Sequence, residues 1–584
     1  MKKRFAIPLT AMLLCAVMLF SSACAANGAA TPSSGDPSVS GTEHPANGAR
    51  KIVPATVKLY HKADDFDEIA AAHYEGCSEI LLIDTATMYQ EFFDGLLGAK
   101  GPFTYEETET TLTIKRANGA YCTFDFVEDS LEFNNFDLFT AYGYGNMADL
   151  LDFPYTDAEG NSFYFSRTDS LDIAGLPIYI DFAERNIPLD IYGGKKYIPF
   201  QTFNDIFLSP FCYNVAYNGQ DLFMAAGGAL DASVTEQYYS VEPAERSKEL
   251  TEFAANELCL LLDLFYGLQD EHGVLVGFET FMEHTGLWED LTSPDAGKAG
   301  AALASLTFGY LADQHSAVTM ASPYTGHSTL QEPITISQSF LQYLDYCQEI
   351  QAARAEMMPD GVAGYLEVGN TAYVTFDTFT ISPTRAPNKY DENAQNTDDT
   401  FGLIIYAHSM ITRENSPIEN VVLDLSCNGG GAVDAGFYVA AWMLGYCHPH
   451  VTNPITNSYA TAGFKADVNL DGVFDEKDSV ADKNLYCLIS PASFSCGNLV
   501  PSLFKESGKV TLLGNTSGGG ACSVQPVSMA DGTLFQISSP HHLAAVSNGA
   551  YYTIDRGIEP HHYFGKFESY FDRQALTAYI NGLK

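Results

Sequence analysis

The spacing of hydrophobic and polar residues divides the chain into three stretches. From about Lys51 to Ala226, short runs such as "TLTIKRA", "CTFDFV" and "IYIDFA" alternate apolar with polar residues and are separated by Gly, Asn and Asp. A period of two is the spacing of a strand with one buried face. This stretch therefore predicts one or two β-rich α+β modules.

From about Val241 to Ser316 the apolar spacing becomes helical. In "SKELTEFAANELCLLLDLFYGL" the apolar residues near one face are Leu250, Phe253, Leu258, Leu261 and Phe265. A second segment, "AGKAGAALASLTFGYLADQHS", is rich in Ala and Leu and ends in polar residues. The two segments predict a small helical subdomain.

From about Gly364 onward, apolar strand-like runs alternate with helix-like segments. Such alternation is typical of βαβ units around a largely parallel sheet, so the fold class is multi-domain α/β. The predicted boundaries are a signal peptide over 1–24, a flexible linker over 25–50, N-terminal α+β modules over 51–230, a helical subdomain over 231–355 and a catalytic-type core over 356–584.

The first residues predict export. "MKKR" precedes an apolar run from Phe5 to Phe20 and then "FSSAC", the form of a secretory signal. The stretch resembles a bacterial lipobox, in which Cys24 is lipidated and becomes the mature N-terminus, although Ser21 stands where Leu is more usual. We expect a lipid-anchored protein on the outer face of a bacterial membrane. Cleavage within "ACA", which gives a secreted protein, is the alternative.

Charge and cysteine content narrow the function classes. The 584 residues carry a formal net charge of −43, which disfavours nucleic-acid binding through phosphate contacts. The 12 cysteines include no CxxC pair and no histidine at zinc spacing, so we expect most to be buried apolar residues.

Candidate chemistry lies where three predicted strands end, the usual place for active sites in parallel sheets. "VVLDLSCNGGG" delivers Asn428 and three glycines to a loop, "SFSCGN" opens a helix, and "LLGNTSGGG" enters a glycine turn. The first loop lacks the Gly-Lys-Ser/Thr of a phosphate loop. Amides that bind an oxyanion are its better functional interpretation, and an ordinary glycine turn is the alternative.

These three motifs, in this order, resemble the core of the tail-specific, or C-terminal-processing, serine peptidase family over roughly residues 245–584. The resemblance implies a crotonase-like ββα core, peptide or protein substrates and Ser495, rather than Ser493, as the nucleophile. Typical members use a Lys base in the last glycine turn, where this chain has Gly519. The branch that resembles the tricorn core and interphotoreceptor retinoid-binding protein uses a His and an acid instead, which implies His315 and Asp555.

The implied residues would form a triad. Ser495 would attack the substrate, His315 would accept its proton and Asp555 would orient the imidazole. The amides of Cys496 and of Gly429 or Gly430 would hold the oxyanion, and no cofactor is needed for catalysis.

Each candidate has a structural alternative. Ser495 is also a good helix N-cap, His315 suits a helix C-terminus, and Asp555 stands in a turn with Glu559 as a rival acid. Other histidines that could serve as bases, although polar loop positions explain them better, are His541, His542, His561 and His562.

A separate motif, "DVNLDGVFDEKD", has the spacing of a calcium loop with Gly at the sixth position. Its predicted ligands are Asp467, Asn469, Asp471, Val473 through its backbone carbonyl, Asp475 and Asp478. We expect structural Ca²⁺ here, and an acidic solvated turn is the alternative.

Together these features predict an exported serine peptidase that forms an acyl-enzyme. A non-catalytic surface lipoprotein that binds a ligand or peptide on the same fold is the main alternative, and an adhesion or scaffold protein is a third. The substrate and the oligomeric state stay open.

Overall fold

The computed structural model describes residues 50–98, 101–141, 147–148, 164–242, 244–381, 399–547 and 550–583. The predicted signal peptide with Cys24, and the predicted linker up to residue 49, lie outside these ranges. Within them, no helix has the length and apolar character that crossing a membrane requires.

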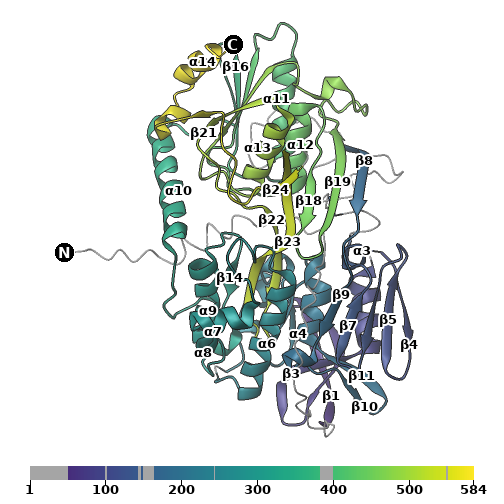
Figure 1. Cartoon of the computed structure of the whole chain (residues 1–584). Coiled ribbons are helices and arrows are strands. Elements are labelled where there is room, and N and C mark those ends of the chain that lie inside the picture. The colour runs from purple at the N-terminus through teal and green to yellow at the C-terminus, as the bar shows by residue number, and fades with distance from the viewer. Residues whose placement is uncertain are drawn as a thin grey trace, which may run out of the picture.

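Most of the described residues between 51 and 242 form two β-sheets with short helical segments (Figure 1). One sheet has the strand order β10 (Asp190–Tyr192), β11 (Lys195–Pro199), β3 (Cys77–Asp84), β2 (Asp65–Tyr74), β1 (Ile52–Lys62), β13 (Leu222–Met224) and β12 (Val215–Tyr217). The other has the order β4 (Phe103–Glu107), β5 (Thr111–Arg116), β6 (Tyr121–Asp125), β7 (Ser130–Phe133) and β9 (Ile178–Asp181). In β5, buried Leu112 and Ile114 alternate with half-buried threonines, as the period of two predicts.

Short helical segments connect these strands. They are α2 (Thr85–Thr87), η1 (Met88–Leu96), α3 (Phe136–Thr140), η3 (Ala183–Arg185), α4 (Phe200–Phe203), η4 (Asn204–Leu208), η5 (Ser209–Phe211), η6 (Ala226–Gly228), η7 (Ala232–Val234) and α5 (Thr235–Tyr238).

The middle of the chain is helical, as its spacing predicts. Its helices are α6 (Lys248–Phe265), α7 (Phe278–Thr285), α8 (Leu287–Leu291), α9 (Ala296–Ser305), η8 (Leu306–Leu311), η9 (Pro323–Thr325) and α10 (Gln338–Met357). Ser247 caps α6 by accepting the amide of Leu250, and the predicted apolar face of α6 is buried. Between η8 and η9 lies the short strand β14 (Ala317–Met320).

The third stretch is built around a six-stranded sheet that is mostly parallel. Its order is β15 (Tyr365–Val368), β16 (Thr371–Thr375), β17 (Asn420–Asp424), β20 (Asn484–Ile489), β21 (Val510–Gly514) and β25 (His562–Tyr563). The helices of this stretch are α11 (Thr400–Thr412), α12 (Val433–Leu444), η10 (Glu476–Asp478), α13 (Cys496–Ser507), η11 (Phe567–Tyr570) and α14 (Arg573–Asn581).

Both faces of this sheet are covered. Val421 and Leu423 of β17 share a hydrophobic core with α11, α12 and α13, whereas Val422 packs on the opposite face with residues of α10 and α14. Apolar residues at consecutive positions are what a parallel sheet buried on both faces requires. The predicted α/β class is confirmed.

Another large sheet, here called the second sheet, contains strands from all three stretches. Its order is β14, β23 (Leu534–Ser547), β18 (His450–Asn453), β19 (Ser458–Ala466) and β8 (Phe165–Ile173), with β22 (Cys522–Ser528) and β24 (Ala550–Thr553) also paired to β23. Strand β8 belongs to the predicted N-terminal modules and β14 to the helical subdomain. The segments on either side of the predicted boundaries at 230 and 355 therefore contribute strands to the same sheet. Its central strand β23 lies near the middle of the molecule in Figure 1.

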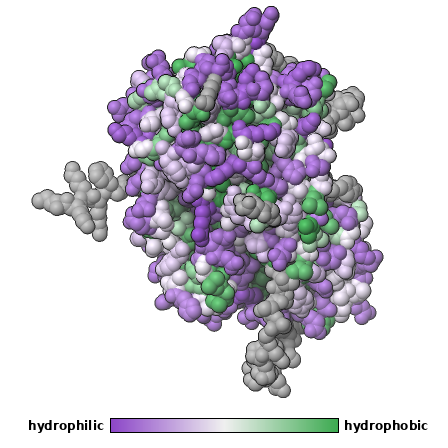
Figure 2. All heavy atoms as spheres, turned by 45° about the horizontal axis from the view of Figure 1, so that its top comes forward, coloured by the Kyte–Doolittle hydropathy of each residue, from purple (hydrophilic) through white to green (hydrophobic). Residues whose placement is uncertain are grey.

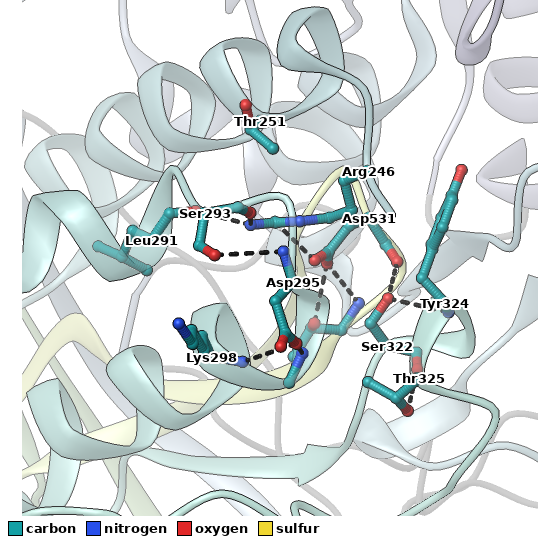
Figure 3. A network of polar contacts seen from close by, with 12 residues as sticks. Arg246, Thr251, Leu291, Ser293, Asp295, Lys298, Ser322, Tyr324, Thr325 and Asp531 are labelled. Atoms are coloured by element: carbon teal, nitrogen blue, oxygen red, sulfur yellow. Dashed lines mark hydrogen bonds and ion pairs between the residues drawn. The ribbon is translucent and has the colours of Figure 1, made fainter. Parts of the chain in front are cut away.

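A buried ion pair ties the helical stretch to the second sheet (Figure 3). Arg246 contacts Asp531, in the turn between β22 and β23, with an Nη1–Oδ2 distance of 2.8 Å, and both side chains are fully buried. The same guanidinium donates to the carbonyls of Leu291 and Ser293. A charge pair without water is stable only when such additional hydrogen bonds are present, so these segments are fixed against each other.

Polar residues cover much of the surface. The face seen in Figure 2 is mostly hydrophilic, with hydrophobic residues in small separate patches. Several cysteines are buried thiols, as predicted, among them Cys122, Cys259, Cys447 and Cys487.

Candidate active site

The turn from β20 into α13 separates two serines with different environments. Ser493 is fully buried, and its Oγ donates to the carbonyl of Leu425 at 2.7 Å while accepting the amide of Ser490 at 2.9 Å. Both of these contacts hold the turn together. Ser493 therefore has a structural role.

Ser495 is the only residue between 492 and 500 that is not buried. Its backbone has φ 54° and ψ −120°, a conformation that costs a residue with a side chain on the order of 1–3 kcal/mol. The amide of Ser495 donates to the carbonyl of Gly519 at 2.9 Å, which holds the chain in this conformation. A serine on a sharp strand-to-helix turn is the arrangement that exposes a nucleophile above a sheet.

His315 lies beside this turn. Its ring packs against Phe494, with the ring centroids 4.6 Å apart, and its carbonyl accepts from the side chain of Gln536 at 2.6 Å. His315 is buried, and among the described residues its Nε2 has no hydrogen-bond partner. Burial lowers the pKa of His315, while the nearby carboxylates of Asp313 and Asp555 act in the opposite direction.

Asp555 follows β24 and is held against the last glycine turn. Its Oδ1 accepts the amide of Ala521 at 3.1 Å, and its carbonyl accepts the amide of Gly520 at 3.3 Å. Asp555 is close enough to His315 to raise its pKa, whereas the side chain of Glu559 is exposed. The geometry favours Asp555 over Glu559 as the acid beside the histidine.

The predicted oxyanion donors are not equivalent. The amide of Cys496 is at the first position of α13, where a helix provides no internal acceptor. The amide of Gly429 donates to the carbonyl of Asp377 at 3.0 Å and that of Gly430 donates to Oδ1 of Asn428 at 2.9 Å. The Gly430 loop does lie against the nucleophile, because a Cβ on Gly430 would be 3.1 Å from Oγ of Ser495. Either glycine amide must exchange its present acceptor before it can bind an oxyanion.

The other histidines have structural surroundings. His542 contacts the carbonyl of Gly267 through Nε2 at 2.7 Å, and Nδ1 of His561 is 2.9 Å from the amide of Leu512. Nδ1 of His562 is 3.2 Å from the hydroxyl of Tyr579. The fourth, His541, contacts two serine hydroxyls, and burial lowers its pKa to about 3.

Two residues that the sequence analysis did not select help to position His315. Phe494 supplies the ring against the imidazole, and Asp313 accepts the amide of His315 at 3.0 Å and also the hydroxyl of Ser316. The sequence signal for Asp313 is its place two residues before the histidine, the spacing of an Asx turn. Phe494 has no such signal, because its contact joins distant parts of the chain.

The predicted calcium loop connects β19 to β20, the strand that leads to Ser495. Among the described residues, no group of three or more His, Cys, Asp or Glu side chains is arranged to hold a metal ion. Two of the six predicted ligands in this loop, Asn469 and the carbonyl of Val473, are outside those residue types. The calcium site stays a prediction.

Gly519 cannot be replaced by the Lys of typical tail-specific peptidases without rearrangement. Its φ is 87°, and a Cβ built on it would lie 1.7 Å from the carbonyl oxygen of Asp555. A side chain at this position would displace the segment that carries the candidate acid. The close approach of Gly519 to the carbonyl of Asp555 therefore leaves no room for a Lys side chain at position 519.

Comparison with known proteins supports this interpretation of the core. Residues 370–564 match the model of peptidase family S41. No curated protein matches the chain. The matched residues include Ser495 and Asp555, whereas His315 lies before them.

Solved structures that are similar to this chain include a lipoprotein from Streptococcus agalactiae, with 12% identity over 58% of this chain and 97% of that chain at a TM-score of 0.34. Mature CPAF is 12% identical over 57% of this chain and 96% of its own, with a TM-score of 0.38. The tricorn protease is 11% identical over 91% of this chain and 59% of its own, with a TM-score of 0.29.

Replacement of Gly519 by Lys tests the steric exclusion. We expect Gly519→Lys and Gly519→Ala to lose reactivity at Ser495 alike, because the Cβ common to both meets the carbonyl of Asp555. Reaction with a serine-directed fluorophosphonate, together with the melting temperature, measures this. A reactive Gly519→Lys variant beside an inactive Gly519→Ala variant would show that the site accepts a Lys base and would contradict the argument.

Proposed function

We propose, because residues 370–564 match the model of peptidase family S41, that this chain is an exported serine peptidase with Ser495 as nucleophile, His315 as base and Asp555 as the acid. The backbone of Ser495 carries the proposal. Its positive φ and partial exposure, between buried neighbours at the start of α13, support a nucleophile and not a helix cap. Within the described chain no side-chain capping bond accompanies Ser495, which argues against a role as helix N-cap.

In the proposed mechanism Oγ of Ser495 attacks the carbonyl carbon of a peptide bond while Nε2 of His315 accepts its proton. The amide of Cys496 donates to the oxyanion, a contribution of about 3 kcal/mol in other serine enzymes. The protonated His315 then gives its proton to the leaving amine. Water, deprotonated by the same imidazole, attacks the ester, and the acyl group leaves as a carboxylic acid while Oγ recovers its proton.

The electrostatics support His315 as a base at neutral pH. A base must be neutral to accept a proton, and burial lowers the pKa of His315 below its usual 6.5. Its Nε2 has no partner within the described chain and is available for a proton. Catalytic hydrogen bonds are often formed only when substrate is bound, so the absent Ser–His bond is compatible with this role.

The same absent bond favours a second candidate function. A protein that keeps the peptidase fold but binds a ligand or peptide without cleaving it needs no contact between Ser495 and His315. The experiment on Ser495 below separates the two candidates.

The first prediction concerns the nucleophile. We expect a fluorophosphonate probe to label the purified protein, Ser495→Ala to abolish labelling, and His315→Ala to slow it by at least about 10³-fold, because an unassisted serine is a weak nucleophile. Ser507→Ala, at the far end of α13, is the matched control and should label normally. Absence of labelling in the unmodified protein would favour the non-catalytic binding protein.

The second prediction concerns the acid. Asp555→Asn should lower kcat/KM by about 10²–10⁴-fold, because the imidazole loses the carboxylate that stabilises its charged form. Since Asp555 raises the pKa of His315, its removal should also move the acid limb of the pH–rate profile to lower pH. The control Glu559→Gln, at an exposed position, should change neither quantity. A fall in rate without a shift of the acid limb would mean that the Asp555 side chain acts only through its contact with the amide of Ala521.

The third prediction concerns export. We propose that the chain is cleaved between Ala23 and Cys24, and that lipidated Cys24, as the mature N-terminus, anchors the protein to the membrane, with residues 25–50 as a tether. Metabolic labelling with a fatty-acid analogue should mark the wild-type protein and not Cys24→Ala, which should appear in the culture medium or stay as uncleaved precursor. An unlabelled, secreted wild-type protein would support cleavage within "ACA" instead.

A further inference from the structure

The loop between β19 and β20 contains a buried carboxylate oxygen without a partner. Asp467 begins the loop and is only 1% exposed, and Oδ1 of its carboxylate has no hydrogen-bond partner in the described part of the chain. The other oxygen, Oδ2, accepts the amide of Gly472 at 2.9 Å. Gly472 is the sixth residue of the loop, so the carboxylate faces the loop interior. A buried, uncompensated carboxylate oxygen requires a cation or a donor.

No side chain of the loop supplies that cation. The nearest lysines are Lys477, whose Nζ contacts Asp475 at 3.2 Å, and Lys465, whose Nζ donates to the carbonyl of Phe474 at 3.4 Å. Meanwhile the carboxylates of Asp471 and Asp478 add negative charge around Asp467. The loop interior therefore concentrates charge of one sign that its own residues do not neutralise.

The backbone of the loop is already arranged around this interior. Asp478 accepts the amides of Val468, Asn469 and Asp475, at 2.8, 3.2 and 2.9 Å, and so joins the two ends of the loop. Gly472 has a φ of 77°, which the sharp turn at the sixth position needs.

We infer that residues 467–478 bind one Ca²⁺ ion, with Oδ1 of Asp467 and the carboxylate of Asp478 as its buried ligands, and with exposed Asp471 and half-buried Asp475 as ligands that close on the ion. Asn469 and the carbonyl of Val473 complete a set of oxygen donors. Ca²⁺ suits this set because it accepts six to eight oxygens in flexible geometry, whereas Mg²⁺ demands a regular octahedron and keeps its waters. Among the described residues the acidic side chains are not grouped as a metal site, so binding requires Asp471 and Asp475 to move toward Asp467.

The ion would stabilise the structure that supports the nucleophile. The carbonyl of Asp467 accepts the hydroxyl of Tyr438 at 2.9 Å, and the amide of Val480, just after the loop, donates to the carbonyl of Trp442. Both partners are on α12, the helix that begins directly after the Gly429–Gly431 loop and packs against α13. A bound ion that rigidifies the loop would therefore also stabilise α12 and α13, the two helices beside the candidate site.

Titration of the purified protein, after removal of divalent ions with a chelator, tests this inference. We expect calorimetry with CaCl₂ to give one site per chain with a Kd at or below about 10⁻³ M, and we expect the melting temperature to rise with Ca²⁺ but not with equal Mg²⁺. Asp471→Ala should weaken binding at least tenfold and leave the melting temperature of the metal-free protein unchanged, since this side chain is exposed.

The matched control is Asp482→Ala, an exposed acidic residue outside the loop, which should bind Ca²⁺ as the wild type does. Absence of binding heat and of a melting shift at millimolar Ca²⁺ would overturn the inference, and so would unchanged binding by Asp471→Ala. Because binding is measured directly, neither result depends on peptidase activity.

Discussion

The sharp turn at Ser495 is the constraint on which the rest of the site depends. Strand β20 lies between β17 and β21, so the loops that follow these two neighbours flank the turn on either side. The amide of Phe494 donates to the carbonyl of Asn428 from one loop, and the amide of Ser495 donates to the carbonyl of Gly519 from the other. A strained backbone persists only where its surroundings determine it from several directions. Two glycine-rich loops do so here because their main chains can approach the turn closely.

The proposed base and the proposed acid are positioned beside this turn by strands of the sheet that contains β23. His315 lies two residues before β14 and Asp555 lies two residues after β24, and both strands pair with the long strand β23. Strand β23 therefore sets the distance between the two residues, and the parallel sheet sets the position of the nucleophile. Because β14 belongs to the helical stretch, the residues that match the peptidase family do not by themselves contain the proposed base.

Much of this arrangement follows from local sequence patterns. The apolar face of α6 and the strands β17 and β20 follow from spacing within a few residues, whereas the preference for Ser495 over Ser493 comes from the resemblance to the peptidase family. The sequence does not predict that β8 pairs outside the N-terminal modules. Most of its residues are exposed, so it lacks the alternation that marks a strand with a buried face. The choice between Asp555 and Glu559 depends on a contact with Ala521, 34 residues away in sequence, which no local pattern reports. The acceptors of the Gly429 and Gly430 amides are equally invisible in the sequence.

Two energetically unfavourable features, a strained backbone and an unpaired buried nitrogen, occur close together at the candidate site, which argues for a functional role. Ser495 carries backbone strain. The buried Nε2 of His315 has no hydrogen-bond partner among the residues that the structure describes, and an unsatisfied buried polar group costs about 1–3 kcal/mol. Two residues earlier in the same turn, Ser493 has both an acceptor and a donor and shows neither cost. The hydrogen bonds of Ser493 are complete, whereas Ser495 is strained and lies near the unpaired imidazole nitrogen of His315. This difference is explained if a bound substrate supplies the contacts that Ser495 and His315 lack. Since Gly519 sterically excludes a Lys base, that imidazole is the group whose unsatisfied nitrogen the chemistry at Ser495 would use.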